Sequence, residues 1–411
     1  MNNIEKNQMG REKSTSFQSY DKFRILSPND SSFSTPLSGI PLHKELDRFQ
    51  GCLVGGAVGD ALGYPVEFLP EPELFARFGT TGITSYALKD GTARISDDTQ
   101  MTLFTANGLL FGTARGRMRG IMAPYASYLA TAYREWYKTQ ISSSPITSKF
   151  NCSWLLHVPE LYAERSPGDT CMGVLGGDYT GTPEDPINFS KGCGGVMRVA
   201  PIGLYFGTSH PLAADMLGAD AAALTHGHEM GYIPAAMLVH IIRLVSHNRE
   251  ITLKEAVLDA RAAMEILFAG RQYLPAFLQR MDQAVSLSET AMDDLTAIHA
   301  LGRGWCGDEA LAIAVYCALK YSGDFEQAII ASVNHRGDSD STGAITGNIL
   351  GAYLGLSGIP GKYLEHLELQ DVILELAEDL YDDCPLRGNS EPQDSKAARW
   401  YEKYVTVTYR K

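Results

Sequence analysis

From about residue 45 onward, apolar residues recur at helical spacing along most of the chain. Segments 231–245 and 309–321 are strongly apolar at intervals of three and four residues, which predicts buried helices. Two helix starts are marked by their residues: 252–255 (TLKE) forms a capping box, and 324–327 (DFEQ) forms a similar one. Alternating patterns typical of strands are scarce, so we expect an all-α protein.

Two glycine series lie within these helical stretches. In each series a glycine returns at every fourth residue, so that all four lie on one helix face: Gly51, Gly55, Gly59 and Gly63, then Gly343, Gly347, Gly351 and Gly355. A glycine costs a helix about 1 kcal/mol relative to alanine, so close helix–helix approach is the expected compensation. The spacing is best known from membranes, but here it predicts tight packing in a soluble core.

Known glycine motifs for nucleotides do not account for these series. No GxxxxGK[ST] is present, and the one GxGxxG, at residues 302–307, follows no strand pattern, so we set the P-loop and dinucleotide-binding hypotheses aside. The longest apolar run, 343–358, is short and contains Asn348. It predicts a buried helix rather than a membrane span.

The chain divides into an N-terminal arm (residues 1–44) and one compact helical domain (residues 45–411). The arm is polar, with isolated aromatic residues and no sustained period, which is typical of a flexible segment. Two interpretations stay open: a dispensable tail, or a recognition arm whose aromatic residues anchor a partner. Segment 140–192, rich in Pro, Gly and Ser, predicts long loops around a site, whereas the run 400–409 is not placed.

Composition narrows the class of protein. The chain of 411 residues is 45% hydrophobic with a net charge of -13 and no sizeable basic run, so neither nucleic acid nor a membrane is an expected partner. Its seven cysteines form no CxxC pair, and the polar N-terminus lacks the apolar core of a signal peptide. Reduced thiols and a cytoplasmic location are therefore expected.

Two acidic clusters carry the candidate chemistry: Ser96-Asp97-Asp98-Thr99 and Asp338-Ser339-Asp340-Ser341. Each runs directly into a helix-like stretch, so each could simply be a helix N-cap. Carboxylates this close repel one another, however, and burying them unpaired is costly. Because hard oxygen ligands suit Mg²⁺, Mn²⁺ or Ca²⁺, two matched clusters favour a metal site.

Five blocks in order make the chain resemble the ADP-ribosylglycohydrolase family, over roughly residues 48–385. The blocks are GDALG (59–63) with Glu67, SDDTQMT (96–102), GCGGVMRVAP (192–201), Thr225-His226 and GDSDSTG (337–343). The resemblance implies an all-α fold around a central dinuclear magnesium site, in which Mn²⁺ could substitute.

The resemblance also implies the metal ligands. One Mg²⁺ is expected on Ser96, Asp97 and Asp98, and the other on Asp338, Asp340 and Ser341, with Asp340 bridging. Relatives usually carry threonine in place of Ser96 and often in place of Ser341; both exchanges keep the hydroxyl ligand. The catalytic carboxylates are expected among Glu67, Asp98 and Asp338, with Asp60 behind them.

Substrate contacts are implied in the same way. Backbone N–H groups of a glycine-dense loop are expected to approach the diphosphate, and the expected binding residues are Gly192, Gly194, Gly195, Met197, Arg198, His226 and Trp305. Cys193 stands where relatives often have a small or polar residue. Arg198 could contact phosphate or be structural, and Trp305 could stack on a base or a guanidinium or belong to the core.

The expected function is Mg²⁺-dependent removal of ADP-ribose from modified arginine side chains of a target protein. Relatives also act on serine and other linkages, so that alternative stays open. The arm resembles the extension of immunity proteins of this family, which makes an ADP-ribosyltransferase toxin a second expected partner, bound and occluded by the arm. A non-catalytic role is opposed by the intact acidic clusters.

Overall fold

The computed structural model describes residues 42–146, 151–207, 211–388 and 392–406. Within these ranges the chain is helical, and the only β pairing is three isolated bridges, which confirms the all-α prediction. The N-terminal arm lies outside the described residues except for its last three, 42–44, and so does the end of the run 400–409. Residues 400–404 of that run belong to the last helix, and residues 405–406 follow it.

The α-helices, in chain order, are α2 (Leu46–Gly63), α3 (Glu71–Phe78), α4 (Asp97–Arg119), α5 (Tyr125–Ile141), α6 (Asp169–Leu175), α7 (Ala200–Tyr205), α8 (Pro211–Ala223), α9 (Glu229–His247), α10 (Leu253–Leu267), α11 (Leu274–Ser288), α12 (Asp294–Leu301), α13 (Gly307–Lys320), α14 (Phe325–Val333), α15 (Ser339–Leu354), α16 (Gln370–Tyr381) and α17 (Ser395–Tyr404). Short 3₁₀ helices lie between them: η1 (Tyr64–Val66), η2 (Trp154–His157), η3 (Pro159–Leu161), η4 (Cys193–Gly195), η5 (Leu356–Gly358) and η6 (Gly361–Tyr363).

Most of the sequence signals for individual helices are confirmed; before α14, Asp324 caps the helix by accepting from the N–H of Gln327. The apolar segments 231–245 and 309–321 lie in α9 and α13, and the capping box before α10 makes both of its expected hydrogen bonds. By length and composition α9 could span a membrane, but it is fully buried inside this protein, packed among α7, α8, α10, α13 and α15. Segment 140–192 is irregular over most of its described length, as predicted.

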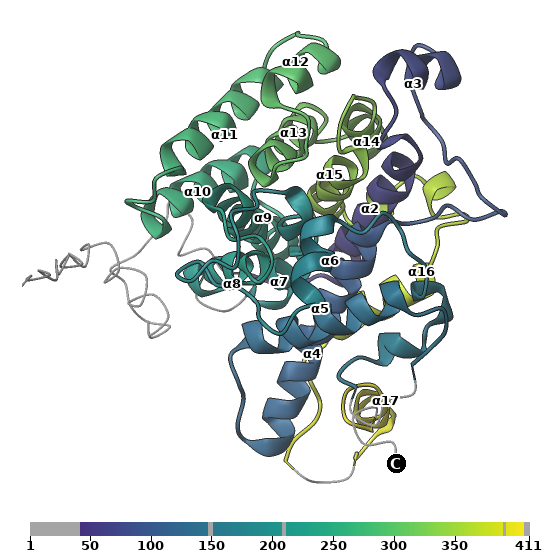
Figure 1. The fold of residues 1–411 in the computed structure, drawn as a ribbon, viewed down its shortest axis with the longest axis vertical. Helices are drawn as coiled ribbons and strands as arrows, with labels where there is room; N and C mark the ends of the chain where they lie inside the picture. The colour runs from purple at the N-terminus through teal and green to yellow at the C-terminus, as the bar shows by residue number, and fades with distance from the viewer. Residues whose placement is uncertain (1–41, 147–150, 208–210, 389–391, 407–411) are drawn as a thin grey trace, which may run out of the picture.

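Helices α2 and α15 lie side by side and antiparallel at the centre of the molecule (Figure 1). A β-carbon built on Gly59 would lie 2.0 Å from the carbonyl oxygen of Gly343, and one on Gly63 would lie 2.3 Å from that of Ser339. The backbones are therefore in direct contact, and the end of α2 meets the start of α15. One glycine differs from expectation: Gly355, with φ of +81°, ends α15 instead of continuing its glycine face.

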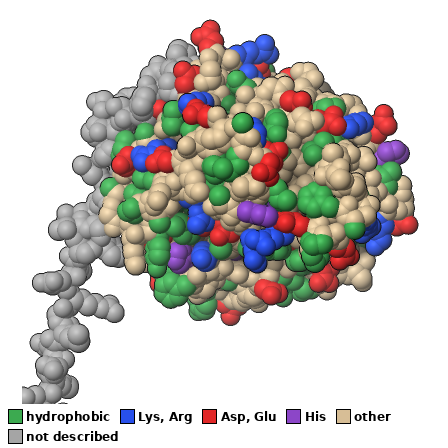
Figure 2. All heavy atoms as spheres, turned by 90° about the horizontal axis from the view of Figure 1, so that it is seen from above, with side chains coloured by type: hydrophobic (Ala, Val, Ile, Leu, Met, Phe, Trp, Pro, Cys, Tyr) green, Lys and Arg blue, Asp and Glu red, His purple; other side chains and the backbone are tan. Residues whose placement is uncertain are grey.

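On the face drawn in Figure 2, acidic and basic side chains are interspersed, and neither kind gathers into a large patch. Apolar side chains are scattered among them, as on most soluble proteins. Two of the larger exposed apolar residues, Phe68 and Trp305, belong to the pocket described below.

The glycine contact makes a stability prediction. In Gly347→Ala, the added β-carbon would lie 1.9 Å from the carbonyl oxygen of Gly55, and backbone cannot move aside as a flexible side chain does. Although alanine favours a helix by about 1 kcal/mol, overpacking costs about 1–3 kcal/mol and occasionally more. We expect a net loss of about 2 kcal/mol in unfolding free energy, measured by urea denaturation.

Gly323→Ala is the matched control, because a β-carbon there meets nothing within 4 Å and the residue has no positive φ. Its unfolding free energy should stay within about 0.5 kcal/mol of the parent protein. Equal stability of the two variants would mean that the helices do not need this close approach.

Candidate functional site

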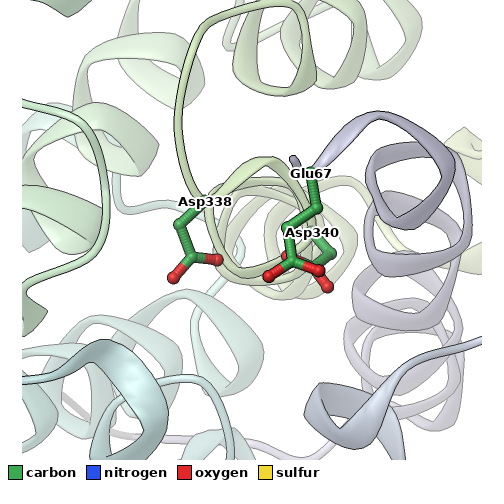
Figure 3. Close-up of side chains that lie close together, drawn as sticks. All are labelled: Glu67, Asp338 and Asp340. Carbon is green, nitrogen blue, oxygen red and sulfur yellow. The ribbon is translucent and has the colours of Figure 1, made fainter. Parts of the chain in front are cut away.

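Three carboxylates meet where α2 ends and α15 begins. Glu67 follows η1 directly after α2, Asp338 is the N-cap residue of α15, and Asp340 lies in its first turn. Their oxygen atoms lie within 4.8 Å of one another, and all three side chains are buried. Figure 3 shows them pointing into the same space from the two helices. This group (Glu67, Asp338 and Asp340) is hereafter called the acidic triad.

The other acidic cluster begins α4 on the opposite side of this space. The Ser96 hydroxyl accepts from the Asp98 N–H at 3.2 Å and caps the helix. Asp60, fully buried on α2, accepts from the backbone N–H groups of Ser96 at 2.9 Å and Thr99 at 3.1 Å. Asp60 thus holds the start of α4 from behind, and both clusters cap helices while facing a common pocket.

The pocket has a volume of about 540 Å³, within the range of small-molecule sites. It brings together most of the residues named from the sequence: Glu67, Asp97, Asp98, Gly192, Gly194, Met197, His226, Trp305, Asp338, Asp340 and Ser341. Ser96, Gly195 and Arg198 do not line it. Ser96 and Gly195 are chain neighbours of the lining residues Asp97 and Gly194.

Arg198 is fully buried, and its guanidinium bonds inside the protein. It donates to the carbonyl of Ala221 at 2.9 Å and to the Thr225 hydroxyl at 2.7 Å, and it lies over the ring of Tyr133. Of the two roles left open for Arg198 by the sequence, this geometry agrees with the structural one. Because Thr225 in turn bonds the Nδ1 of His226 at 2.8 Å, Arg198 positions the histidine that does line the pocket.

The glycine loop packs against that histidine. A β-carbon on Gly192 would lie 3.2 Å from Nε2 of His226, and one on Gly194 would lie 3.1 Å from its Cε1. Burial, together with nearby Arg198, lowers the pKa of His226 to about 3, so the imidazole is neutral. Between the two glycines, the Cys193 thiol donates to Asp338 Oδ2 at 2.7 Å.

Trp305 lies at the pocket, not in the core, and is 39% exposed. It stacks on Phe68, with ring centroids 5.8 Å apart. Sequence analysis missed Phe68, although an aromatic residue directly after Glu67 was a usable signal. Segment 166–170, which forms a wall of the pocket, lies in the stretch predicted to form loops around a site, although its individual residues were not predicted.

The buried carboxylates of the pocket favour the binding of a cation. Burial, with Asp338 and Asp97 nearby, raises the pKa of Glu67 from 4.5 to about 9. Burial and neighbouring carboxylates also raise the pKa values of Asp98 and Asp340 well above their usual range. No lysine or arginine is among the described residues that line the pocket, so nothing there neutralises these carboxylates.

Two buried oxygen atoms in the pocket, Glu67 Oε2 and Asp98 Oδ1, have no hydrogen-bond partner. Buried polar atoms are normally satisfied, and orphaned carboxylate oxygens are what a hard divalent cation requires. The residues present therefore fit Mg²⁺ or Mn²⁺. The acidic triad would hold a cation on one side of the pocket, with Asp97 and Asp98 facing it from the other.

The fold and the pocket together define an all-helical protein with a site of small-molecule size, which is lined by a glycine loop and by carboxylates. The chain belongs to the ADP-ribosylglycohydrolase family, whose model matches residues 41–390. This confirms the family expected from the five sequence blocks.

Individual relatives are distant but cover most of the chain. ADP-ribosylarginine hydrolase Tri1 of Pseudomonas putida is 26% identical over 83% of this chain and 79% of its own. ADP-ribosylhydrolase ARH3 of Danio rerio is also 26% identical, over 84% and 95%. A solved structure of an ADP-ribosylglycohydrolase-related protein complex matches with a TM-score of 0.53 and 27% identity, covering 82% of this chain and 97% of that one.

The raised carboxylate pKa values predict how stability depends on pH. With EDTA present, the folded protein keeps a proton on Glu67 between pH 4.5 and about 9, whereas the unfolded chain has released it. Raising the pH through this window therefore favours unfolding. We expect the melting temperature to fall across it in EDTA and to be restored by Mg²⁺, as measured by calorimetry.

Glu67→Gln should flatten this pH dependence and lose most of the Mg²⁺-dependent gain. Glu135→Gln is the matched control, since burial raises the pKa of Glu135 to about 7, away from the pocket. That variant should keep the full Mg²⁺ gain. If both variants respond to Mg²⁺ alike, the acidic triad is not the cation site.

Proposed function

We propose that this glycohydrolase is dependent on a divalent cation and removes ADP-ribose from modified arginine side chains of a target protein. One observation carries the proposal: the acidic triad, with an orphaned Glu67 oxygen, faces a pocket with a glycine-loop wall. The proposed cofactor is Mg²⁺, with Mn²⁺ as a substitute, and the proposed location is the cytoplasm.

The residues divide into a binding side and a reacting side. Gly192 and Gly194 leave backbone room for a diphosphate beside neutral His226. A divalent cation, when bound, supplies Lewis-acid polarisation of substrate hydroxyls and water. These parts orient the ribose so that its anomeric carbon faces the carboxylates.

Hydrolysis breaks the bond between the anomeric carbon and the guanidine nitrogen and forms a bond from that carbon to water oxygen. The leaving nitrogen takes up one proton and the water loses one. We assign the proton exchange to Glu67, whose Oε2 is buried in the pocket and unpartnered, so that one oxygen of this carboxylate contacts the cation while the other exchanges a proton. Asp98 and Asp338, the other carboxylates expected from the sequence, are assigned to cation binding.

Arginine as the leaving group is supported at the pocket mouth. The exposed carboxylates Glu164 and Asp169 line it, together with the Trp305–Phe68 stack. Acidic and aromatic groups favour a guanidinium over an uncharged serine. The name of the Tri1 relative, an ADP-ribosylarginine hydrolase, agrees. A toxin partner for the arm stays a prediction, because residues 1–41 of the arm lie outside the described residues.

The first test is release of ADP-ribose from an ADP-ribosyl-arginine protein, followed by chromatography. Activity should require Mg²⁺, stop in EDTA, and fall in Asp340→Asn by at least about 100-fold, because even residues behind metal ligands cost 10–100-fold. Glu135→Gln should remain active. Full activity of Asp340→Asn would contradict the cation-dependent mechanism.

The linkage is tested by comparing arginine- and serine-linked substrates at matched concentration. We expect kcat/KM to be at least about tenfold higher for arginine and the preference to shrink in Trp305→Ala, since a cation–π contact contributes about 0.5–2 kcal/mol. Faster release from serine would keep the glycohydrolase class but reject arginine as the target.

A further inference from the structure

Arg165 and Glu368 form an ion pair behind the pocket, 203 residues apart in the sequence. The guanidinium makes two contacts with the carboxylate, Nη2 to Oε1 at 2.8 Å and Nη1 to Oε2 at 3.3 Å. Both side chains are about nine-tenths buried, and neither lines the pocket. Such a two-pronged contact fixes geometry as well as charge.

The pair holds the chain on both sides of Ser96. Glu368 Oε2 accepts from the N–H of Ile95 at 3.0 Å, and Arg165 Nη1 donates to the carbonyl of Ile95 at 3.4 Å. The carbonyl of Arg165 itself accepts from the N–H of Asp97 at 3.1 Å. The residues immediately before and after Ser96 are thus bonded to one buried pair.

The same contacts fix the facing wall of the pocket. Three residues after Arg165, the N–H of Gly168 donates to Asp97 Oδ2 at 3.3 Å. Between them Ser166 has a φ of +54°, a backbone conformation uncommon for a residue with a side chain. Arg165 therefore joins the loop that walls the pocket to the carboxylate that faces the acidic triad.

The segment carrying Glu368 is also held under strain. His366 and Leu369 have φ values of +67° and +58°, and residues in this region persist only where their surroundings over-determine them. Backbone bonds do so here: Ala93 N–H donates to the carbonyl of His366 at 2.8 Å, and Glu368 N–H donates to that of Ala93 at 3.0 Å. These backbone bonds hold Glu368 in one defined position.

We infer that Arg165 and Glu368 are positioning residues that hold Asp97 in the orientation needed to bind a cation. The inference rests on the proposed function in one respect, namely that the carboxylates of the pocket bind a divalent cation. Groups behind metal ligands typically change metal affinity by 10–100-fold. Because the pair itself is neutral in sum, its effect is on geometry rather than on the net charge of the site.

The test compares two arginine-to-lysine variants of the full chain. Arg165→Lys keeps the charge but loses the fork that reaches both oxygens. Arg261→Lys does the same at another two-pronged pair, with Asp282, which joins α10 to α11 away from the pocket and is more exposed. Mn²⁺ binding to EDTA-stripped protein is measured by calorimetry, and melting temperature is measured on the same samples.

We expect Arg165→Lys to raise the Kd for Mn²⁺ about tenfold and Arg261→Lys to leave it unchanged. Glu368→Gln provides a second route, since it keeps an oxygen for Ile95 but loses one for Arg165. Because it also removes a negative charge, it should weaken Mn²⁺ binding at least as much as Arg165→Lys does. The double variant should bind no more weakly than the worse single variant, because one interaction is being removed.

Two outcomes would overturn the inference, and they differ. If Arg165→Lys and Glu368→Gln both fold and bind Mn²⁺ with unchanged affinity but melt at a lower temperature, the ion pair is purely structural and the cation site stays intact. Absence of Mn²⁺ binding by the unaltered protein would reject the cation site of the proposed function, and the positioning role would fall with it.

Discussion

The direct backbone contact between α2 and α15 is the constraint on which the site depends. A β-carbon on Gly351 would lie 1.9 Å from the carbonyl of Gly51, as close as the contact at Gly347, so no larger residue fits without separating the helices. Because the helices run antiparallel in this register, Glu67, which follows the short helix η1 after α2, reaches Asp338 and Asp340 at the start of α15. A larger side chain between the helices would hold them further apart and would separate the carboxylates of the acidic triad. Among the described residues, this is the only group of carboxylates close enough to share a cation.

The same helix α2 also sets the third element of the site. Asp60 accepts from the first turn of α4, and burial raises its own pKa to about 6 even though those bonds lower it. Raised pKa values throughout this region mean that the cation-free protein holds its carboxylates at a cost in stability. The pocket carboxylates therefore need rigid support from the residues around them. Without Asp60 on one side and Arg165 and Glu368 on the other, mutual repulsion would push these carboxylates toward solvent. Preorganised ligands of this kind are expected where a cation must be held in a defined geometry.

What could be predicted from the sequence depends on how far apart along the chain the interacting residues lie. Helical periods, the box at Thr252 and the glycine series are local, so α9, α10, α2 and α15 were predictable from a few residues each. The two acidic clusters were predictable as a joint site because like charges imply a shared counter-charge. The sequence left open whether Arg198 contacts phosphate or is structural, because its partners Ala221 and Thr225 come from a separate part of the fold. Arg165 and Glu368 had no local signal at all, since their contact spans most of the domain.

The two ends of the pocket are built differently, and this difference bears on specificity. The reacting end lies on helix termini locked by glycine contacts, so its geometry is tied to the fold itself. The mouth is built from Phe68, Trp305, Glu164 and Asp169, which lie in loops or at the start of a short helix and carry exposed aromatic and acidic side chains. Loop residues can change without disturbing the α2–α15 contact. The mouth can therefore vary among chains that share this fold, whereas Glu67, Asp338 and Asp340 cannot move apart without disturbing the α2–α15 contact.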